Sequence, residues 1–232
     1  GNVSASSPTS KKSLATSKHH YQFVDSPMGR RILLDNLQQQ TSVCFDTETT
    51  SLKALEADLV GIAFSWEVGT GYYVHVPEDK TAAQEVVEQF RPFFENPNIE
   101  KIGHNLKYDL KVLSNYALQV TGPFYDTMIA HYLINPDRRH SMDILASSYL
   151  NYEPQSITEL IGKKGKNQGS MRDVPLDVQA EYAVEDADIT LQLKHYFDQE
   201  LAAAENGKLF RDVELPLVEV LSAMEQEGIN LN

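Results

Sequence analysis

The sequence predicts an α/β domain in which helices cover a mixed β-sheet. Three short runs rich in β-branched and aromatic residues come first, and a turn-rich spacer between the second and third predicts a hairpin. Segments with apolar residues at helical spacing then alternate with further short strands. The predicted order is β-β-β-α-β-α-β-α, which is typical of an antiparallel opening followed by strand–helix units.

The opening strands are predicted at residues 41–47, 59–66 and 72–76. The first of them, TSVCFDT, combines β-branched and aromatic residues and is bounded by polar ones. The spacer at residues 67–71 contains Gly69 and Gly71 and fits a hairpin connection. We therefore expect these strands to be antiparallel.

The next segments alternate between helix and strand. Apolar residues recur at helical spacing over residues 81–94, and the Asn96-Pro97 pair should end that helix. A strand, a helix, a strand and a helix are then predicted at residues 99–102, 105–116, 124–125 and 126–134. These elements complete the predicted core.

The C-terminal part is predicted to be mostly helical. A helix near residues 142–150, a Gly/Lys-rich loop at 162–169, a long helix at 176–203 and an amphipathic helix at 209–226 follow in order, and Gly228 ends the last one. The loop lacks the spacing of a nucleotide-binding loop and does not follow a strand, so it is either a basic loop that touches phosphates or a solvated loop. We expect a flexible linker or tag over residues 1–20, one domain over 21–205, and a separate helix over 206–232.

Composition fits one globular domain without a membrane segment. With 41% hydrophobic residues among 232, the chain can form a sizeable core. No apolar run approaches the roughly 20 residues that span a bilayer, and no signal-peptide pattern opens the sequence, so we expect a cytosolic protein. The single cysteine, Cys44, lies in an apolar stretch and should be a small buried hydrophobe. The net charge of −13 argues against a nucleic-acid partner, unless acidic clusters bind cations and reverse the local charge.

Asp46 and Glu48 lie two residues apart on the first predicted strand, so their side chains point to the same face of the sheet. Two carboxylates this close repel each other unless a cation lies between them, and such oxygen ligands suit Mg²⁺ or Mn²⁺. A solvated strand end is the alternative, because 33 of the 232 residues are Asp or Glu and the pattern arises by chance.

Two later helices carry further candidates. Asn105 and Asp109 are four residues apart and share a helix face, although singly they are better explained as an N-cap and a surface acid. His104 fits a hydrogen-bonded structural histidine better than a metal ligand. Tyr182 and Asp186 are also four apart, and a phenol beside a metal-bound carboxylate can orient a water, although such a pair is usually just surface.

Together these residues indicate more than each does alone. Four acids and one tyrosine, placed on a strand and two later helices of an α/β core, form the pattern of a two-metal site for phosphoryl transfer. The set is Asp46, Glu48, Asp109, Tyr182 and Asp186.

The motifs FDTETTSL, GHNLKYDLKVL, FYDTMIAHYLI and YAVEDADITLQL resemble those of the proofreading exonuclease domain of family A DNA polymerases, to which bacterial DNA polymerase I belongs. This is the tyrosine-containing branch of the four-carboxylate (DEDD) exonucleases. The similarity runs from about residue 21 to 232, and the end LPLVEVLSAMEQEGINLN resembles the helix that leads into the polymerase domain.

The resemblance implies a ribonuclease H-like fold and removal of nucleotides from DNA 3′ ends, as nucleoside monophosphates. It implies two divalent cations, Mg²⁺ or Mn²⁺, with Zn²⁺ as an alternative at one site. Asp46, Glu48 and Asp186 would hold the cation that activates water, and Asp46 with Asp109 the cation at the leaving 3′ oxygen. Tyr182 would orient the water.

The resemblance also implies how the substrate is held. Leu52 would wedge against the terminal bases, while Asn105 and Arg139 would contact the strand near the scissile phosphate. His104 stands where the best-known members have Gln and would lie among these DNA contacts. The partners implied are single-stranded or frayed DNA 3′ ends and a polymerase domain of the same parent chain. The resemblance also implies a monomer that acts in the bacterial cytoplasm, at the nucleoid.

Two alternatives stay open. One is an RNA-trimming exonuclease of the same superfamily, and the other is a catalytically silent module that binds single strands or braces a polymerase. No polymerase domain is found in the 232 residues, so polymerisation by this chain is not expected.

Overall fold

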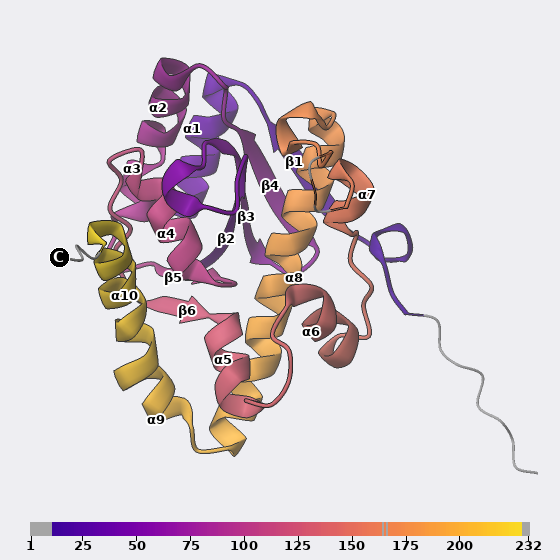
Figure 1. The fold of residues 1–232 in the computed structure, drawn as a ribbon, viewed down its shortest axis with the longest axis vertical. Coiled ribbons are helices and arrows are strands. Elements are labelled where there is room, and N and C mark those ends of the chain that lie inside the picture. Colours follow the sequence, from indigo (N-terminus) through magenta and orange to yellow (C-terminus); the bar gives the residue numbers. More distant parts are fainter. Residues whose placement is uncertain (1–10, 164, 166, 229–232) are drawn as a thin grey trace, which may run out of the picture.

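A six-stranded mixed sheet forms the centre of the computed structural model, which describes residues 11–163, 165 and 167–228 (Figure 1). The strand order is β1-β4-β3-β2-β5-β6. β2, β3 and β4 pair antiparallel, whereas β1 pairs parallel with β4, and β5 and β6 continue parallel from β2. The strands are β1 His20–Val24, β2 Ser42–Thr49, β3 Leu59–Glu67, β4 Thr70–His75, β5 Glu100–Gly103 and β6 Phe124–Asp126.

Helices cover both faces of the sheet (Figure 1). One face carries α1 Pro27–Leu37, α2 Lys80–Gln89, α3 Arg91–Phe94 and α4 Leu106–Ser114. The other carries α5 Thr127–Ile134, α6 Met142–Tyr149 and the long α8 Leu176–Ala203. The remaining helices are α7 Ile157–Ile161, α9 Gly207–Leu209 and α10 Leu215–Glu227, of which α10 packs beside α4 and β6. Among the helices described, none combines the length and apolar character needed to cross a membrane.

Side-chain alternation along β2 divides the core into two layers. Val43 and Phe45 belong to the hydrophobic cluster under α1–α4, whereas Cys44 between them belongs to the cluster under α8. Cys44 is fully buried and makes no disulfide, as predicted. The same alternation directs Asp46 and Glu48 toward α8, and Thr47 toward α4.

The predicted fold class is confirmed, and the differences lie in individual elements. β1 and α1 precede the first predicted strand, and neither is among the predicted elements. The single helix predicted at residues 81–94 is two helices, because the chain leaves the helix at Phe90 and Pro92 has no N–H to continue the ladder. The helix predicted at residues 209–226 begins as α9 and passes through a π-helical turn, Phe210–Glu214, before α10.

The segment expected as a linker is partly attached to the fold. Residues 1–10 lie outside the described residues, as do 164 and 166 of the Gly/Lys-rich loop and 229–232 at the end. Lys12, however, pairs with the chain after α6, because its N–H donates to the Asn151 carbonyl at 2.9 Å and its carbonyl accepts from Glu153 N–H at 2.8 Å. Leu14–Thr16 then forms a short 3₁₀ turn.

The long helix α8 lies close against the sheet. At Gly71 in β4, a Cβ atom would collide with the Val184 side chain of α8 and would come within 2.8 Å of the Phe64 carbonyl. Glycine is therefore required there, because only a residue without Cβ permits so close an approach of helix and strand.

One buried carboxylate caps two helices. Asp126, at the end of β6, accepts hydrogen bonds from the backbone N–H groups of Asn105 and Leu106 at the start of α4, at 3.1 and 2.8 Å. It also accepts from Met128 and Ile129 at the start of α5, at 2.8 and 3.3 Å. Asn105 occupies the N-cap position of α4, as predicted, but its own side chain makes no cap hydrogen bond, and the Asp126 carboxylate bonds to the first N–H groups instead.

We predict that Asp126→Ala lowers the free energy of unfolding by about 1–4 kcal/mol, because two helix starts lose their cap at about 0.5–2 kcal/mol each. Asp79→Ala is the matched control, since Asp79 is exposed and accepts from one backbone N–H, that of Ala82, at 2.9 Å. Urea denaturation followed by circular dichroism measures both. Equal losses in the two variants would contradict the double cap.

Candidate active site

Three carboxylates meet where α8 crosses the end of β2. Asp46 and Glu48 lie on the face of β2 that looks toward α8, and Asp186 lies on α8 itself. One oxygen from each of the three side chains lies within 4.8 Å of the others. This all-oxygen donor set fits a hard divalent cation such as Mg²⁺ or Mn²⁺.

A fourth carboxylate approaches the same point from the other side of the sheet. Asp109, in the first turn of α4, is 3% exposed, and its Oδ1 accepts hydrogen bonds from the N–H of Thr47, at 3.3 Å, and from the Thr47 hydroxyl. Asp109 is not within the group of three, but its charge still raises the pKa of Asp46. Thr47, between the two acids of β2, thus fixes the position of Asp109.

These acids hold their negative charges at a high energetic cost. Burial raises the pKa of Asp46 well above its usual range, and the charges of Asp109, Glu48 and Asp186 raise it further. Burial and the neighbouring acids raise the pKa of Glu48 to about 8. Burial also raises the pKa of Asp109 and of Asp186 to about 7 in each case. A bound cation would remove most of this cost, because it stabilises the ionised forms.

Tyr182 lies beside Asp186, one turn earlier on α8. Its hydroxyl lies close enough to the Asp186 carboxylate to lower the pKa of that group. Burial, followed by the charge of Asp186, raises the pKa of Tyr182 itself, so the phenol keeps its proton and remains a hydrogen-bond donor.

The surface has a cavity of about 720 Å³ that is lined by Tyr182 and Asp186. Its opposite wall comes from α6, through Asp143 and Ser147, and from residues 156–158 at the start of α7. Binding clefts for small molecules typically measure about 300–1,000 Å³. Tyr182 and Asp186 therefore face a space large enough to admit the end of a chain.

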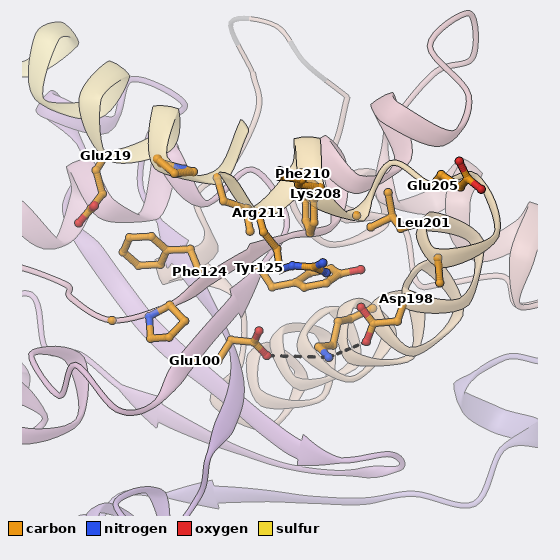
Figure 2. Close-up of a pocket in the computed structure, with 17 residues that line it drawn as sticks. Glu100, Phe124, Tyr125, Asp198, Leu201, Glu205, Lys208, Phe210, Arg211 and Glu219 are labelled. Carbon is orange, nitrogen blue, oxygen red and sulfur yellow. Dashed lines mark hydrogen bonds and ion pairs between the residues drawn. The ribbon is translucent and has the colours of Figure 1, made fainter. Parts of the chain in front are cut away.

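A second cavity lies away from the carboxylates. It has a volume of about 650 Å³ and lies between β6, the C-terminal half of α8 and the turn before α10 (Figure 2). Lys194 is neutralised there by Asp198 at 2.7 Å and Glu100 at 3.8 Å, the contacts drawn as dashed lines. No predicted site residue lines this cavity.

Three of the four residues expected to hold the substrate, Leu52, His104 and Asn105, lie on segments that follow β2 and β5. Leu52 is 78% exposed on the loop after β2, which is unusual for a large apolar side chain. The Tyr108 hydroxyl, on α4, donates to the carbonyl of Ser51 and so holds this loop. Asn105 is exposed and has the left-handed backbone conformation, with φ of 64°.

His104 and Arg139 differ in their surroundings. The His104 Nδ1 is hydrogen-bonded to the Thr127 hydroxyl at 2.8 Å, and its Nε2 is buried without a partner among the described residues. Burial lowers the pKa of His104 to about 4, so the ring is neutral near pH 7. Arg139 is exposed on the loop between α5 and α6.

Two features of the site were missed from the sequence. Strand alternation could have shown that Thr47 points away from Asp46 and Glu48, toward the helix with Asp109. The wall formed by Asp143 and residues 156–158 had no sequence signal, because it depends on how α6 and α7 fold back over α8.

Comparison with known proteins agrees with this geometry. A family model described as a 3′–5′ exonuclease matches residues 21–202. DNA polymerase I of Chloroflexus aurantiacus is 38% identical over 206 residues, which cover 86% of this chain and 22% of that protein. DNA polymerase I of Borreliella burgdorferi is 34% identical over 204 residues, with 86% and 22% coverage. The chain therefore spans about a fifth of the length of these curated relatives.

Solved structures show the same fold at lower identity. NrnC of Brucella melitensis superposes with a TM-score of 0.71 and 23% identity, covering 91% of this chain and 94% of that one. The likeness supports the ribonuclease H-like sheet and its helical cover. With the family model matching most of its residues, the chain belongs to the 3′–5′ exonuclease family, as an exonuclease domain of the DNA polymerase I type.

Proposed function

We propose that this chain hydrolyses the terminal phosphodiester bond at the 3′ end of DNA and releases nucleoside monophosphates. The observation that carries the proposal is the meeting of Asp46, Glu48 and Asp186 within 4.8 Å at the edge of a cavity that Tyr182 also lines. The family match supports the reaction class, and the DNA polymerase I relatives support DNA as the substrate.

Two divalent cations, Mg²⁺ or Mn²⁺, fit the donor set. Asp46, Glu48 and Asp186 would hold one, and Asp46 would hold the other together with Asp109, whose charge acts on Asp46. When bound, such cations lower the pKa of water and stabilise negative charge on the oxygens of the phosphodiester.

The remaining steps belong to side chains of this chain. The protonated Tyr182 hydroxyl beside Asp186 would orient the attacking water toward phosphorus. The exposed Leu52 would press against the terminal bases, while His104, Asn105 and Arg139 would contact the strand. Thr47 would keep Asp109 in place during the reaction.

The activity would serve proofreading in a longer protein. The relatives are DNA polymerases of which this chain spans about a fifth, so a polymerase domain of the same polypeptide is the proposed partner. The helix pair α9–α10 follows the region that the family model matches and would lead toward that domain.

We predict that Asp186→Ala reduces metal-dependent release of mononucleotides from a single-stranded DNA by about 10³-fold or more, since it removes a donor shared by the three-carboxylate group. Glu181→Ala is the matched control, because Glu181 is an exposed acid on the same helix. Thin-layer or gel analysis of labelled oligonucleotides with Mn²⁺ or with chelator measures the release.

Glu181→Ala should keep wild-type activity, and chelator should abolish the activity of the wild type and of Glu181→Ala. Unchanged release by Asp186→Ala would contradict the assignment. Absence of release by the wild type with either cation would support a silent single-strand-binding module instead.

Substrate preference separates DNA proofreading from RNA trimming. We predict that a DNA oligonucleotide is degraded at least about 10-fold faster than the RNA of the same sequence, a ratio that differential transition-state binding can supply. Initial rates under identical Mn²⁺ concentrations measure it. A strong RNA preference would overturn DNA as the substrate.

Stability of the metal-free protein should depend on pH. Because the pKa of Glu48 is raised to about 8 and those of Asp109 and Asp186 to about 7, the folded protein binds protons more tightly than the unfolded chain. Their contribution to stability is therefore present below about pH 4 and is lost as pH rises to about 8. In chelator we expect Tm to fall between pH 5 and 8, by roughly 2–4 °C per kcal/mol lost.

Mn²⁺ should raise Tm more at pH 8 than at pH 5, because the cation and protons compete for the same oxygens. Glu48→Gln is the control that removes one of the buried charges, and it should flatten the fall in chelator. Differential scanning fluorimetry measures Tm of the wild type in chelator, of the wild type with Mn²⁺, and of Glu48→Gln in chelator. A Tm in chelator that rises steadily over this range would show that the acids are not held as the structure indicates.

A further inference from the structure

The loop between α5 and α6 presents two unpaired cations. Arg138 and Arg139 are both exposed, and neither forms an ion pair within the part of the chain that the structure describes. In a chain with a net charge of −13, adjacent arginines without acidic partners are available for a phosphate.

This loop is attached at both ends to one buried histidine. His131, on α5, is 1% exposed, and its Nδ1 lies 2.6 Å from Nδ1 of His140, the residue after Arg139. On its other side, His131 Nε2 lies 2.9 Å from the Tyr149 hydroxyl. The Asn135 side-chain amide, at the start of the loop, donates to the same hydroxyl at 2.9 Å.

Two arrangements of protons fit the donors and acceptors of this network, and in both Asn135 donates to the Tyr149 oxygen. In one, the Tyr149 hydroxyl donates to His131 Nε2, and His131 Nδ1–H donates to His140 Nδ1. In the other, His131 Nε2–H donates to the Tyr149 oxygen, and His140 Nδ1–H donates to His131 Nδ1. Burial lowers the pKa of His131 to about 4, which keeps this ring neutral near pH 7.

The loop ends beside the cavity of the active site. Three residues after His140, Asp143 lines the cavity together with Tyr182 and Asp186. The His140 backbone also lies against the ring of His104, at the start of the segment that carries Asp109. The position of His140 therefore sets where the preceding Arg139 stands relative to a strand in that cavity.

We propose that His131 and Tyr149 are positioning residues for substrate binding, which hold His140 and thereby place Arg139 against a phosphate of the DNA strand. This inference rests on the proposed function. The effect should appear in affinity, because none of these groups lies in the group of carboxylates.

Two substitutions of His131 separate its two hydrogen bonds. His131→Asn keeps a polar group near the position of Nδ1 and can still bond to His140, whereas His131→Gln keeps one near Nε2 and can bond only to Tyr149. Tyr149→Phe removes the hydroxyl that joins Asn135 to His131. Tyr132→Phe is the matched control, because the exposed Tyr132 packs its ring on His140 at 5.6 Å and its hydroxyl makes no hydrogen bond with any described residue.

The readouts are Kd for a fluorescent single-stranded DNA by anisotropy, with chelator present, and KM and kcat for mononucleotide release. His131→Gln and Arg139→Ala should each raise Kd and KM about 10-fold, the size of one charged hydrogen bond, with kcat changed less than about twofold. Both should lower the slope of log Kd against log salt by about 0.7, the value for one phosphate contact on a single strand. Tyr149→Phe should raise Kd to a smaller extent, and His131→Asn and Tyr132→Phe should resemble the wild type.

The double variant His131→Gln/Arg139→Ala tests whether His131 affects DNA binding through Arg139. If His131 acts through Arg139, the double variant binds no more weakly than Arg139→Ala alone. A wild-type Kd for His131→Gln and Tyr149→Phe, or losses that add in the double variant, would overturn the positioning role while the exonuclease proposal stands. If the wild type binds DNA as expected but releases no mononucleotides, the proposed function fails and the Kd series still tests the inference.

Discussion

The burial of several like charges at one crossing of strand and helix is the constraint on which the rest of this structure depends. One oxygen of each of Asp46, Glu48 and Asp186 lies within 4.8 Å of the others. Burial raises the pKa of all three, and neighbouring acids raise each further. The contact is possible because α8 lies close on the sheet, where Gly71 leaves room for Val184. A fold that spends stability in this way needs rigid support around the crossing.

Other acids of α8 supply that support. Asp188 accepts from the Tyr21 hydroxyl at 2.8 Å and from Gly69 N–H at 2.9 Å, and Glu185 accepts from the Tyr152 hydroxyl at 2.6 Å and from Gln155 N–H at 3.0 Å. Their charges are satisfied by donors of the chain. Among the described residues, no donor hydrogen-bonds to the carboxylates of Asp46 and Glu48 on β2, so their oxygens have no partner within the chain. The acids of α8 that brace the fold thus differ from the strand acids that meet at the crossing, whose all-oxygen donor set fits a divalent cation.

The sequence predicted the sheet, its antiparallel opening and the bounds of α8, because alternation and helical periodicity are local properties. It missed β1, which acquires its place only by pairing with β4. It also missed α1, although the Ser26-Pro27 start and the spacing of Leu33 and Leu37 are local signals of a helix. It placed Asn105 correctly at the N-cap position of α4 but did not predict that the carboxylate bonded to the first N–H groups comes from Asp126, 21 residues away. A cap from a distant strand leaves no spacing pattern to detect.

The sequence by itself determined which residues can do chemistry here. The strand period places Asp46 and Glu48 on one face, and the helix period places Tyr182 beside Asp186. Only the tertiary structure decided which carboxylates share a point in space, that Asp109 approaches from the opposite face through Thr47, and that His131 ties the Arg139 loop beside the cavity. Local periodicity fixes the direction of a side chain along its own element, whereas distances between elements follow from packing of the whole core.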